Sequence, residues 1–428
     1  MVIILYAASI DPTYKSLSGR RFLVVSTNYA PEHAGVGPYS TMTAEHLAAC
    51  GANVDVLAGM PHYPAWRVDH AYRATWRTTE VRQGVRVHRR RHFVPSKQTA
   101  LRRALYEVSF LAHGALSVPV DKPELVLSQV PSLAGGVIGA RISRRWAVPH
   151  VVVVQDLLGA AAVQSGIRGG SRVASIAGRI EARIMRSATR IGVVHESFAD
   201  RIVAMGIPPG KIRVVPNWAH VRPPSGSRKA MRTRLGWRDN EVVVLHSGNM
   251  GLKQGLEVLV DTARFAIRER SGIRVVLMGD GSQRATLQKL ASTLPNVDVR
   301  PPATDEEFPD VLAAADVLAV TQRASVLDMS LPSKLTSYFA AGRPVVASVA
   351  VHGGTAAEVR RSGAGIVVPP EDAEVLHGAI MYLVGDPKRS ERLGARGPAY
   401  VIERLSMDAG LRRITALVSE ALTAHNGR

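Results

Sequence analysis

The chain has 428 residues, a length typical of two or three domains, and its 46% of hydrophobic residues excludes a wholly disordered protein. Its formal net charge of +19 favours an anionic partner, a class that includes nucleic acid, an anionic membrane and a phosphorylated substrate. The excess charge is uneven, because residues 1–220 carry +14 and the remaining residues carry +5. The sequence has no helix-turn-helix, zinc-finger or RNA-recognition signature, so we expect no nucleic-acid partner.

The single cysteine, Cys50, excludes an intramolecular disulfide and a cysteine-based metal cluster, and it fits a reducing cytoplasm. No apolar run reaches the length of a membrane-spanning helix, and the apolar start at Met1–Ile10 lacks the other features of a signal peptide. We therefore expect a cytoplasmic protein without a transmembrane helix.

Short runs rich in β-branched residues recur along the chain, each followed by a helical pattern. These predicted strands are Phe22–Ser26, Val54–Ala58, Leu125–Ser128, His150–Val154, Arg190–Val194, Ile212–Val215, Val242–Ser247, Arg274–Met278, Val317–Thr321, Val345–Ser348 and Gly365–Val368. Buried strands that alternate with helices are typical of parallel sheets covered on both faces, so the predicted class is α/β.

The strand signal pauses between Asn217 and Asn240, where Arg222–Ser227 reads as a linker rich in Pro, Gly and Ser. We therefore expect two Rossmann-like domains, residues 1–220 and 221–403, with a C-terminal helix at about 404–428 that packs back on the first. Ligands of such sheets bind beyond the carboxyl ends of the strands, so two sheets that face each other would form a central cleft.

In the first domain, Gly35 and Gly37 lie where a strand turns into a helix, and a helix N-terminus favours anions. They are candidates for contact with a donor diphosphate, and the alternative is an ordinary strand–helix turn. Asp156 follows the strand His150–Val154. It could accept a hydrogen bond from a sugar hydroxyl, or cap the next segment.

The second domain opens with a glycine-rich loop that carries Gly248, Asn249 and Lys253. Backbone N–H groups, a helix N-terminus and one ammonium can neutralise a pyrophosphate without a metal, although a surface lysine in a turn is the alternative. Gly279 begins a second tight turn after a strand, which we expect to lie near a nucleotide.

The segment Asp328–Ala347 predicts a polar loop, a helix of about two turns that ends at Gly342, and a buried strand. It supplies five of the residues expected to bind the donor, which are Ser330, Leu331, Pro332, Ser333 and Lys334. Glu358, in the helix that follows, is a candidate to bind a ribose diol, or else a solvated helix carboxylate.

Together these elements resemble the family-4 retaining glycosyltransferases of the GT-B fold, and within them the bacterial enzymes that build capsule, O-antigen and colanic acid-type polysaccharides. The resemblance runs from about Arg21 to the C-terminus. It rests on Tyr29–Glu32 with Gly35 and Gly37, Gln155–Leu157, Pro216–Trp218, Gly248-Asn249 with Lys253–Gly255, Gly279–Gly281, Pro332–Leu335 with Ala340–Gly342, and Gly365 through Pro369–Asp372.

This resemblance implies a nucleotide-sugar donor held mainly by the second domain and transfer of its sugar with retention, with no metal and no cofactor. Lys253 matches the diphosphate-binding lysine of the family, whereas Asn249 replaces its companion arginine. The two glutamates of the family fall at Met329 and Ser337, so Asp328 is the substitute expected for the first and Glu358 a candidate for the second. Asp156, Lys253 and Asp328 are therefore the residues expected to carry the chemistry.

The acceptor implied by the resemblance is a polyprenyl-diphosphate-linked saccharide at the inner face of the plasma membrane. Basic stretches at Arg86–His92, Arg102-Arg103 and Arg172–Arg190 fit peripheral contact with anionic lipid, and a solvated face is the alternative for each. Two other functions remain open from the sequence: a non-catalytic GT-B subunit that binds nucleotide sugar, suggested by the missing glutamates, and a sugar-nucleotide epimerase.

Overall fold

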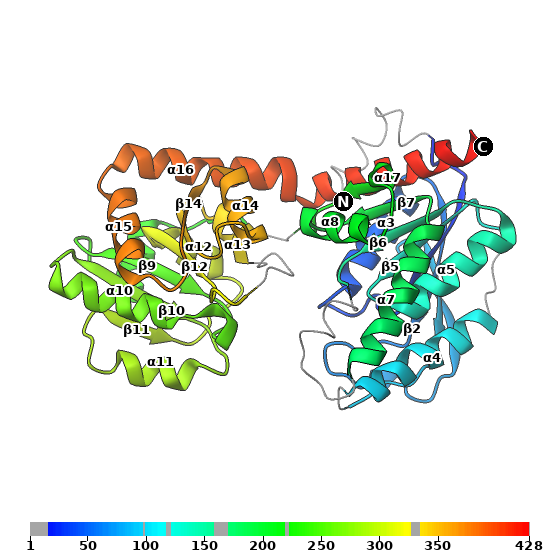
Figure 1. Cartoon of the computed structure of the whole chain (residues 1–428), viewed down its shortest axis with the longest axis horizontal. Coiled ribbons are helices and arrows are strands. Elements are labelled where there is room, and N and C mark those ends of the chain that lie inside the picture. The colour runs from blue at the N-terminus through cyan, green and yellow to red at the C-terminus, as the bar shows by residue number, and fades with distance from the viewer. Residues whose placement is uncertain are drawn as a thin grey trace. The chain divides into compact units, whose positions relative to one another are not determined.

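The computed structural model describes residues 16–96, 99–116, 121–157, 170–218, 222–326 and 334–427. These residues form two compact domains, shown in Figure 1. The first runs to Asn217 and takes up the chain again from Gly410, and the second is Trp218–Ala409. Each is an α/β domain built on one sheet, so the expected fold class is confirmed.

The sheet of the first domain has the strand order β3-β4-β2-β1-β5-β6-β7-β8. Its strands are β1 (Arg21–Ser26), β2 (Asn53–Gly59), β3 (Arg77–Arg82), β4 (Val85–Arg90), β5 (Leu125–Val130), β6 (His150–Val154), β7 (Arg190–Val193) and β8 (Ile212–Val214). The helices are α3 (Gly37–Ala49), η1 (His70–Tyr72), α4 (Ala100–Leu116), α5 (Leu133–Trp146), α7 (Gly170–Ser187), α8 (Glu196–Ala204), η2 (Pro209–Lys211) and, from Gly410 on, α17 (Met407–Asn426).

The sheet of the second domain has the order β11-β10-β9-β12-β13-β14 and is parallel throughout. Its strands are β9 (Val242–Ser247), β10 (Ile273–Met278), β11 (Val297–Arg300), β12 (Val317–Thr321), β13 (Val345–Ser348) and β14 (Gly365–Val368). The helices are α9 (Arg228–Leu235), η3 (Leu252–Gln254), α10 (Glu257–Arg268), α11 (Arg284–Ala291), α12 (Phe308–Ala314), α13 (Lys334–Ala340), α14 (Gly354–Ser362), α15 (Ala373–Val384), α16 (Pro387–Tyr400) and η4 (Val401–Leu405).

Both sheets bury most of their central strands, as the apolar runs predict. Every residue of β5, β6 and β12 is buried, and two separate apolar clusters pack on the sheet of the second domain. Among the described helices, none combines the length and the apolar character needed to cross a bilayer.

The basic stretch Arg86–His92 was expected to form a face that contacts a membrane or solvent, and the structure shows otherwise. It forms β4, whose antiparallel partner β3 was not predicted. Arg89 is fully buried, where its guanidinium donates to Glu80 at 2.6 Å and to the carbonyl of Gly59. A buried arginine needs such partners, so the part of this stretch around Arg89 belongs to the interior of the sheet, whereas Arg86 stays exposed.

Candidate active site

Two glycine-containing loops are joined at the carboxyl edge of the second sheet. The amide of Gly248 donates to the carbonyl of Met278 at 2.9 Å, and the amide of Met250 donates to the carbonyl of Asp280 at 2.7 Å. Gly279 has φ +149°, and a Cβ added there would lie 1.9 Å from the carbonyl oxygen of Gly248. Glycine is therefore required at 279 on both conformational and steric grounds.

Lys334, the first residue of α13, lies against this loop pair. A Cβ placed on Gly248 would be 3.6 Å from its Nζ atom. Burial lowers the pKa of the Lys334 ammonium to about 8. Within the described part of the chain, no carboxylate forms an ion pair with it, and its ammonium lies 3.3 Å from Nε2 of His246.

His246 is the last residue but one of β9, just before the glycine loop, and is fully buried. Burial lowers its pKa well below the ordinary range, and the neighbouring Lys334 adds to the effect. The imidazole is therefore neutral. A protonated lysine can only donate, so Nε2 accepts from Lys334 and the ring hydrogen lies on Nδ1.

Lys253 lies in η3, the turn that follows the glycine loop, and its side chain is exposed. Arg323 fastens this turn to the end of β12, because its amide donates to the Lys253 carbonyl at 3.0 Å and its Nε donates to the Leu252 carbonyl at 2.9 Å. Its guanidinium also pairs with Glu257 at 2.9 Å. The backbone of the turn is thus held while the ammonium of Lys253 stays open to solvent.

Glu358 is buried in α14 rather than solvated. One carboxylate oxygen accepts from Tyr400 at 2.5 Å and the other from Arg361 at 2.6 Å. A ribose diol would have to compete with both partners for this carboxylate. Five further predicted residues, Asp328, Ser330, Leu331, Pro332 and Ser333, lie outside the described part of the chain.

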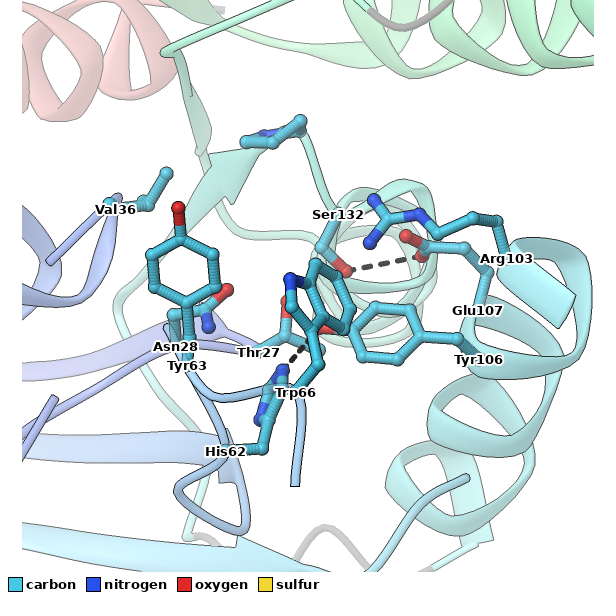
Figure 2. Close-up of a pocket in the computed structure, with 12 residues that line it drawn as sticks. Thr27, Asn28, Val36, His62, Tyr63, Trp66, Arg103, Tyr106, Glu107 and Ser132 are labelled. Atoms are coloured by element: carbon cyan, nitrogen blue, oxygen red, sulfur yellow. Dashed lines mark hydrogen bonds between the residues drawn. The ribbon is translucent and has the colours of Figure 1, made fainter. Parts of the chain in front are cut away.

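The first domain has a pocket of about 170 Å³ at the carboxyl ends of β1, β2 and β5, closed on one side by α4 (Figure 2). Its lining combines aromatic rings with charged and amide side chains. The residues are Thr27, Asn28, Gly35, Val36, His62, Tyr63, Trp66, Arg103, Tyr106, Glu107, Pro131 and Ser132.

A hydrogen-bonded network holds one side of this pocket. Glu32 accepts from the amides of His62 at 2.8 Å and Tyr63 at 2.9 Å, which fixes the loop after β2. His62 Nδ1 lies 2.9 Å from the Met60 carbonyl and therefore donates to it, so Nε2 accepts from the Tyr106 hydroxyl at 3.2 Å. Burial lowers the pKa of His62 against the opposing effect of Glu32.

The other side of the pocket brings a cation, two rings and a carboxyl together. The guanidinium carbon of Arg103 lies 4.9 Å from the ring centre of Trp66 and 5.1 Å from that of Tyr106. Glu107 accepts from the amide of Ala134 at 2.9 Å and from Ser132 at 3.3 Å, and burial raises its pKa. Aromatic faces beside polar groups suit the alternating apolar and hydroxylated surfaces of a sugar.

The chain matches two sequence families, one over each domain. Residues 34–218 match the Glycosyl transferase 4-like domain, and residues 241–386 match Glycosyl transferases group 1. The chain is a GT-B glycosyltransferase of family 4. It is 29% identical over 387 residues to the "Putative colanic acid biosynthesis glycosyl transferase WcaI" of Escherichia coli K12, covering 86% of this chain and 93% of that protein.

Solved structures of low identity share the fold of this glycosyltransferase. Sucrose-phosphate synthase from Thermosynechococcus elongatus is 18% identical with a TM-score of 0.66, and the match covers 95% of this chain and all of that one. Anabaena Alr3699/HepE, solved in complex with UDP-glucose, is 16% identical with a TM-score of 0.61 over 93% of this chain and 99% of that one.

In this glycosyltransferase, the predicted residues fall into separate groups. Gly248, Asn249, Gly279 and Lys334 come together at the loop pair, whereas Lys253 lies in the next turn. Gly35 lines the pocket of the first domain, where a Cβ would lie 2.8 Å from the ring of Tyr63, and Gly37 begins α3.

Asp156 follows β6 at the same edge of the first sheet as this pocket. Its carboxylate accepts from the amide of Leu157 at 2.8 Å and is half-buried.

Sequence reasoning missed most of the first-domain pocket of this glycosyltransferase. No recognisable sequence motif surrounds Trp66, which lies in a loop, or Arg103 and Glu107, which lie in a helix. One signal was present, because Glu107 is the only acidic residue in the otherwise apolar and basic stretch Ala100–Leu116.

Proposed function

We propose that this glycosyltransferase moves a sugar from a nucleotide-sugar donor, with retention of configuration, to a lipid-linked saccharide at the inner face of the plasma membrane. The observation that carries the proposal is the half-buried ammonium of Lys334, which lies against the Gly248 loop without a carboxylate among the described residues. A poorly solvated cation of this kind calls for an anionic ligand.

The diphosphate of a nucleotide sugar is such an anion. Its charge grows as the bond to the sugar breaks, so an ammonium already in place stabilises the transition state more than the bound donor. A second cation, Lys253, is exposed in the turn that follows the Gly248 loop. The complex of HepE with UDP-glucose supports this class of donor.

The first-domain pocket is the proposed acceptor site. Trp66, Tyr106 and Arg103 offer a stacking surface for a sugar ring, and Glu107 and Asn28 offer hydrogen-bonding groups. The relation to WcaI, named for colanic acid biosynthesis, supports a saccharide acceptor of the cell envelope. We expect the reaction to need neither a metal nor a cofactor, because lysines take the charge of the diphosphate.

The test is consumption of a nucleotide sugar by purified enzyme. UDP-, GDP- and dTDP-sugars are offered with polyprenyl-diphosphate-linked saccharides extracted from membranes, with and without EDTA, and the product linkage is read by NMR. We expect one donor to be consumed, an α-linked donor to give an α-linked product, and EDTA to have no effect. Failure of every donor in the presence of acceptor would overturn the proposal.

Two further readouts separate the alternatives. A non-catalytic subunit would bind a nucleotide sugar without turnover. An epimerase would exchange solvent hydrogen into C2 of the donor sugar, which the same assay in D₂O reports.

A further inference from the structure

The sequence motif Tyr29–Glu32, followed by Gly35 and Gly37, lies in the loop between β1 and α3, beside the first-domain pocket. Within this loop Glu32 turns inward and is only 6% exposed, although glutamate is rarely buried in proteins. Among the described residues, no lysine or arginine forms an ion pair with it. A buried carboxylate without a cation depends on hydrogen bonds, so its donors show what it holds.

Two loops of the first domain meet at this carboxylate. One oxygen, Oε1, accepts from the backbone amides of His62 and Tyr63 in the loop after β2. The other, Oε2, accepts from the side-chain amide of Asn28 in the loop after β1 at 2.9 Å. Hydrogen bonds to a charged acceptor are stronger than those between neutral groups. These three hydrogen bonds, called the Glu32 clamp below, therefore join the two loops through one side chain.

The two glycines of the motif make room for the clamp. A Cβ on Gly37 would lie 3.0 Å from Cβ of Glu32 and 3.2 Å from its Oε2 atom. A Cβ on Gly35, which has φ +65°, would lie 2.8 Å from the ring of Tyr63. The β1–α3 loop can therefore lie directly against Glu32 and Tyr63, which a larger residue at either position would prevent.

The loop after β1 is itself fixed to the rest of the domain. The amide of Ala30 donates to the hydroxyl of Thr41 on α3 at 2.8 Å, and its carbonyl accepts from the guanidinium of Arg89 in β4. The hydroxyl of Ser26 donates to the carbonyl of Asn28 at 2.8 Å. Helix and sheet thus hold this loop, and the clamp extends that support to the loop after β2.

The loop after β2 carries two of the aromatic rings that line the pocket, those of Tyr63 and Trp66 (Figure 2). Their centres lie 5.9 Å apart in an edge-to-face arrangement. Trp66 has φ +49°, a backbone conformation that costs free energy for a residue other than glycine. Such a conformation persists only where the surroundings hold it, so the position of this stacking ring depends on the support given to its loop.

We propose that Glu32 is a positioning residue for the acceptor saccharide. It does not line the pocket, and it acts through the clamp, which holds Tyr63, Trp66 and Asn28 in the arrangement that binds the sugar. A site that is ordered before the ligand arrives avoids the cost of ordering side chains on binding. The link to an acceptor rests on the proposed function, whereas the clamp itself does not.

The test compares Glu32→Gln with the reciprocal double variant Asn28→Asp/Glu32→Gln. In the single variant the new amide group faces that of Asn28, so two donors meet and one hydrogen bond is lost. In the double variant the new carboxylate at position 28 accepts from the new amide at position 32, which restores the bond with its direction reversed.

Steady-state kinetics with a membrane-extracted polyprenyl-diphosphate-linked saccharide as acceptor measures the effect. In Glu32→Gln we expect the KM for the acceptor to rise about tenfold, with kcat and the KM for the donor within about twofold of the wild type. The double variant should return the KM for the acceptor to within about threefold of the wild type. In Glu32→Ala, which removes the whole clamp, hydrogen exchange in peptides covering Met60–Trp66 should be about tenfold or more faster.

A matched control neutralises another carboxylate of the same domain. Asp55 on β2 pairs with His88 at 2.7 Å and with Arg86 at 3.1 Å, and none of the three lines the pocket. Asp55→Asn should lower the melting temperature, while the KM for the acceptor and the exchange of Met60–Trp66 stay at their wild-type values. General destabilisation of the domain is thereby separated from loss of the clamp.

Three results would overturn the proposal. These are an equal rise in both KM values for Glu32→Gln, no recovery in the double variant, and wild-type exchange of Met60–Trp66 in Glu32→Ala. Absence of turnover by the wild type would instead remove the proposed function and with it the acceptor role. The exchange measurement needs no substrate, so it decides independently whether Glu32 holds the loop.

Discussion

The Nζ atom of Lys334 lies 3.3 Å from Nε2 of His246, at the point where strand β9 ends in its glycine loop. Both side chains are basic, and burial lowers the pKa of each. The pair therefore carries one positive charge, on Lys334, at a place where the folded protein solvates a charge poorly. Holding this charge there costs free energy while no ligand is bound, and an anion that binds beside it offsets that cost.

Replacing Lys334 with methionine separates binding from stability. Methionine keeps the length of the side chain and removes the buried charge, so we expect the variant to be more stable than the wild type at pH 7 by roughly 1–3 kcal/mol. Its affinity for a nucleoside diphosphate should fall about 10- to 100-fold, the usual range for a hydrogen bond to a charged group. Urea unfolding and calorimetric titration with UDP, GDP and dTDP measure the two effects.

The exposed Lys253 provides the control for this substitution. Lys253→Met should change the free energy of unfolding by less than about 0.5 kcal/mol, as surface substitutions usually do. Reduced stability of Lys334→Met would show that the ammonium is stabilised by partners in the empty protein, and would contradict the argument.

The pH dependence of nucleotide binding follows from the pKa of Lys334, which is about 8 in the folded protein against an ordinary 10.5. Below pH 8 the side chain is protonated in both the folded and unfolded chains, so the cost of burying the charge is fully present. Between pH 8 and 10.5 the unfolded chain keeps the proton that the folded chain has lost, so this contribution to stability becomes more favourable as the pH rises.

Binding shows the opposite trend. A diphosphate needs the protonated ammonium, so we expect affinity to be level below about pH 8 and to weaken above it, with proton uptake on binding. Titrations in buffers of different ionisation enthalpy measure that uptake. The difference between wild type and Lys334→Met isolates the contribution of this group, and an identical pH profile in both proteins would rule it out.

A third prediction concerns the contact between the two glycine loops. In Gly279→Ala, the new Cβ would lie 1.9 Å from the carbonyl oxygen of Gly248, in a backbone conformation with φ +149° that other residues rarely adopt. We expect a loss of roughly 2 kcal/mol or more in the free energy of unfolding. Gly378→Ala is the control, because Gly378 is exposed within α15 and a Cβ there meets nothing within 4 Å. It should stabilise the protein by roughly 0.5–1 kcal/mol.

The strands that could be predicted are those with continuous apolar runs. The predicted ranges of β6, β9, β12 and β13 agree with the structure, because a strand buried on both faces carries its own signal. Strands β3, β4 and β11 were missed because charged residues are interspersed among their apolar residues. The burial of Arg89 depends on Glu80 in the neighbouring strand, a contact that no local pattern contains.

The candidate site could be predicted only in part, for the same physical reason. Gly248, Gly279 and Lys334 follow strands or begin a helix, so their place at the edge of the sheet follows from topology. The depth of Lys334, its contact with His246 and the support that Arg323 gives to the Lys253 turn depend on packing between segments distant in sequence. Glu358 is a further example. Its position in the sequence predicted a ribose ligand or solvent, and not the hydrogen bonds that it makes with Tyr400 and Arg361.

The last prediction concerns the proposed acceptor pocket of the first domain. Trp66 carries the cation–π contact with Arg103 and forms part of the stacking surface, so Trp66→Ala should raise the KM for the saccharide acceptor about tenfold. The KM for the donor should stay unchanged, because the glycine loops and Lys334 belong to the second domain. Arg389→Gln removes a similar contact with Tyr382, 3.8 Å from the ring centre, and serves as the control with both KM values unchanged. Steady-state kinetics with each substrate varied in turn distinguishes the two sites, since an equal rise in both KM values for Trp66→Ala would indicate a general disturbance of the fold rather than a lost acceptor contact.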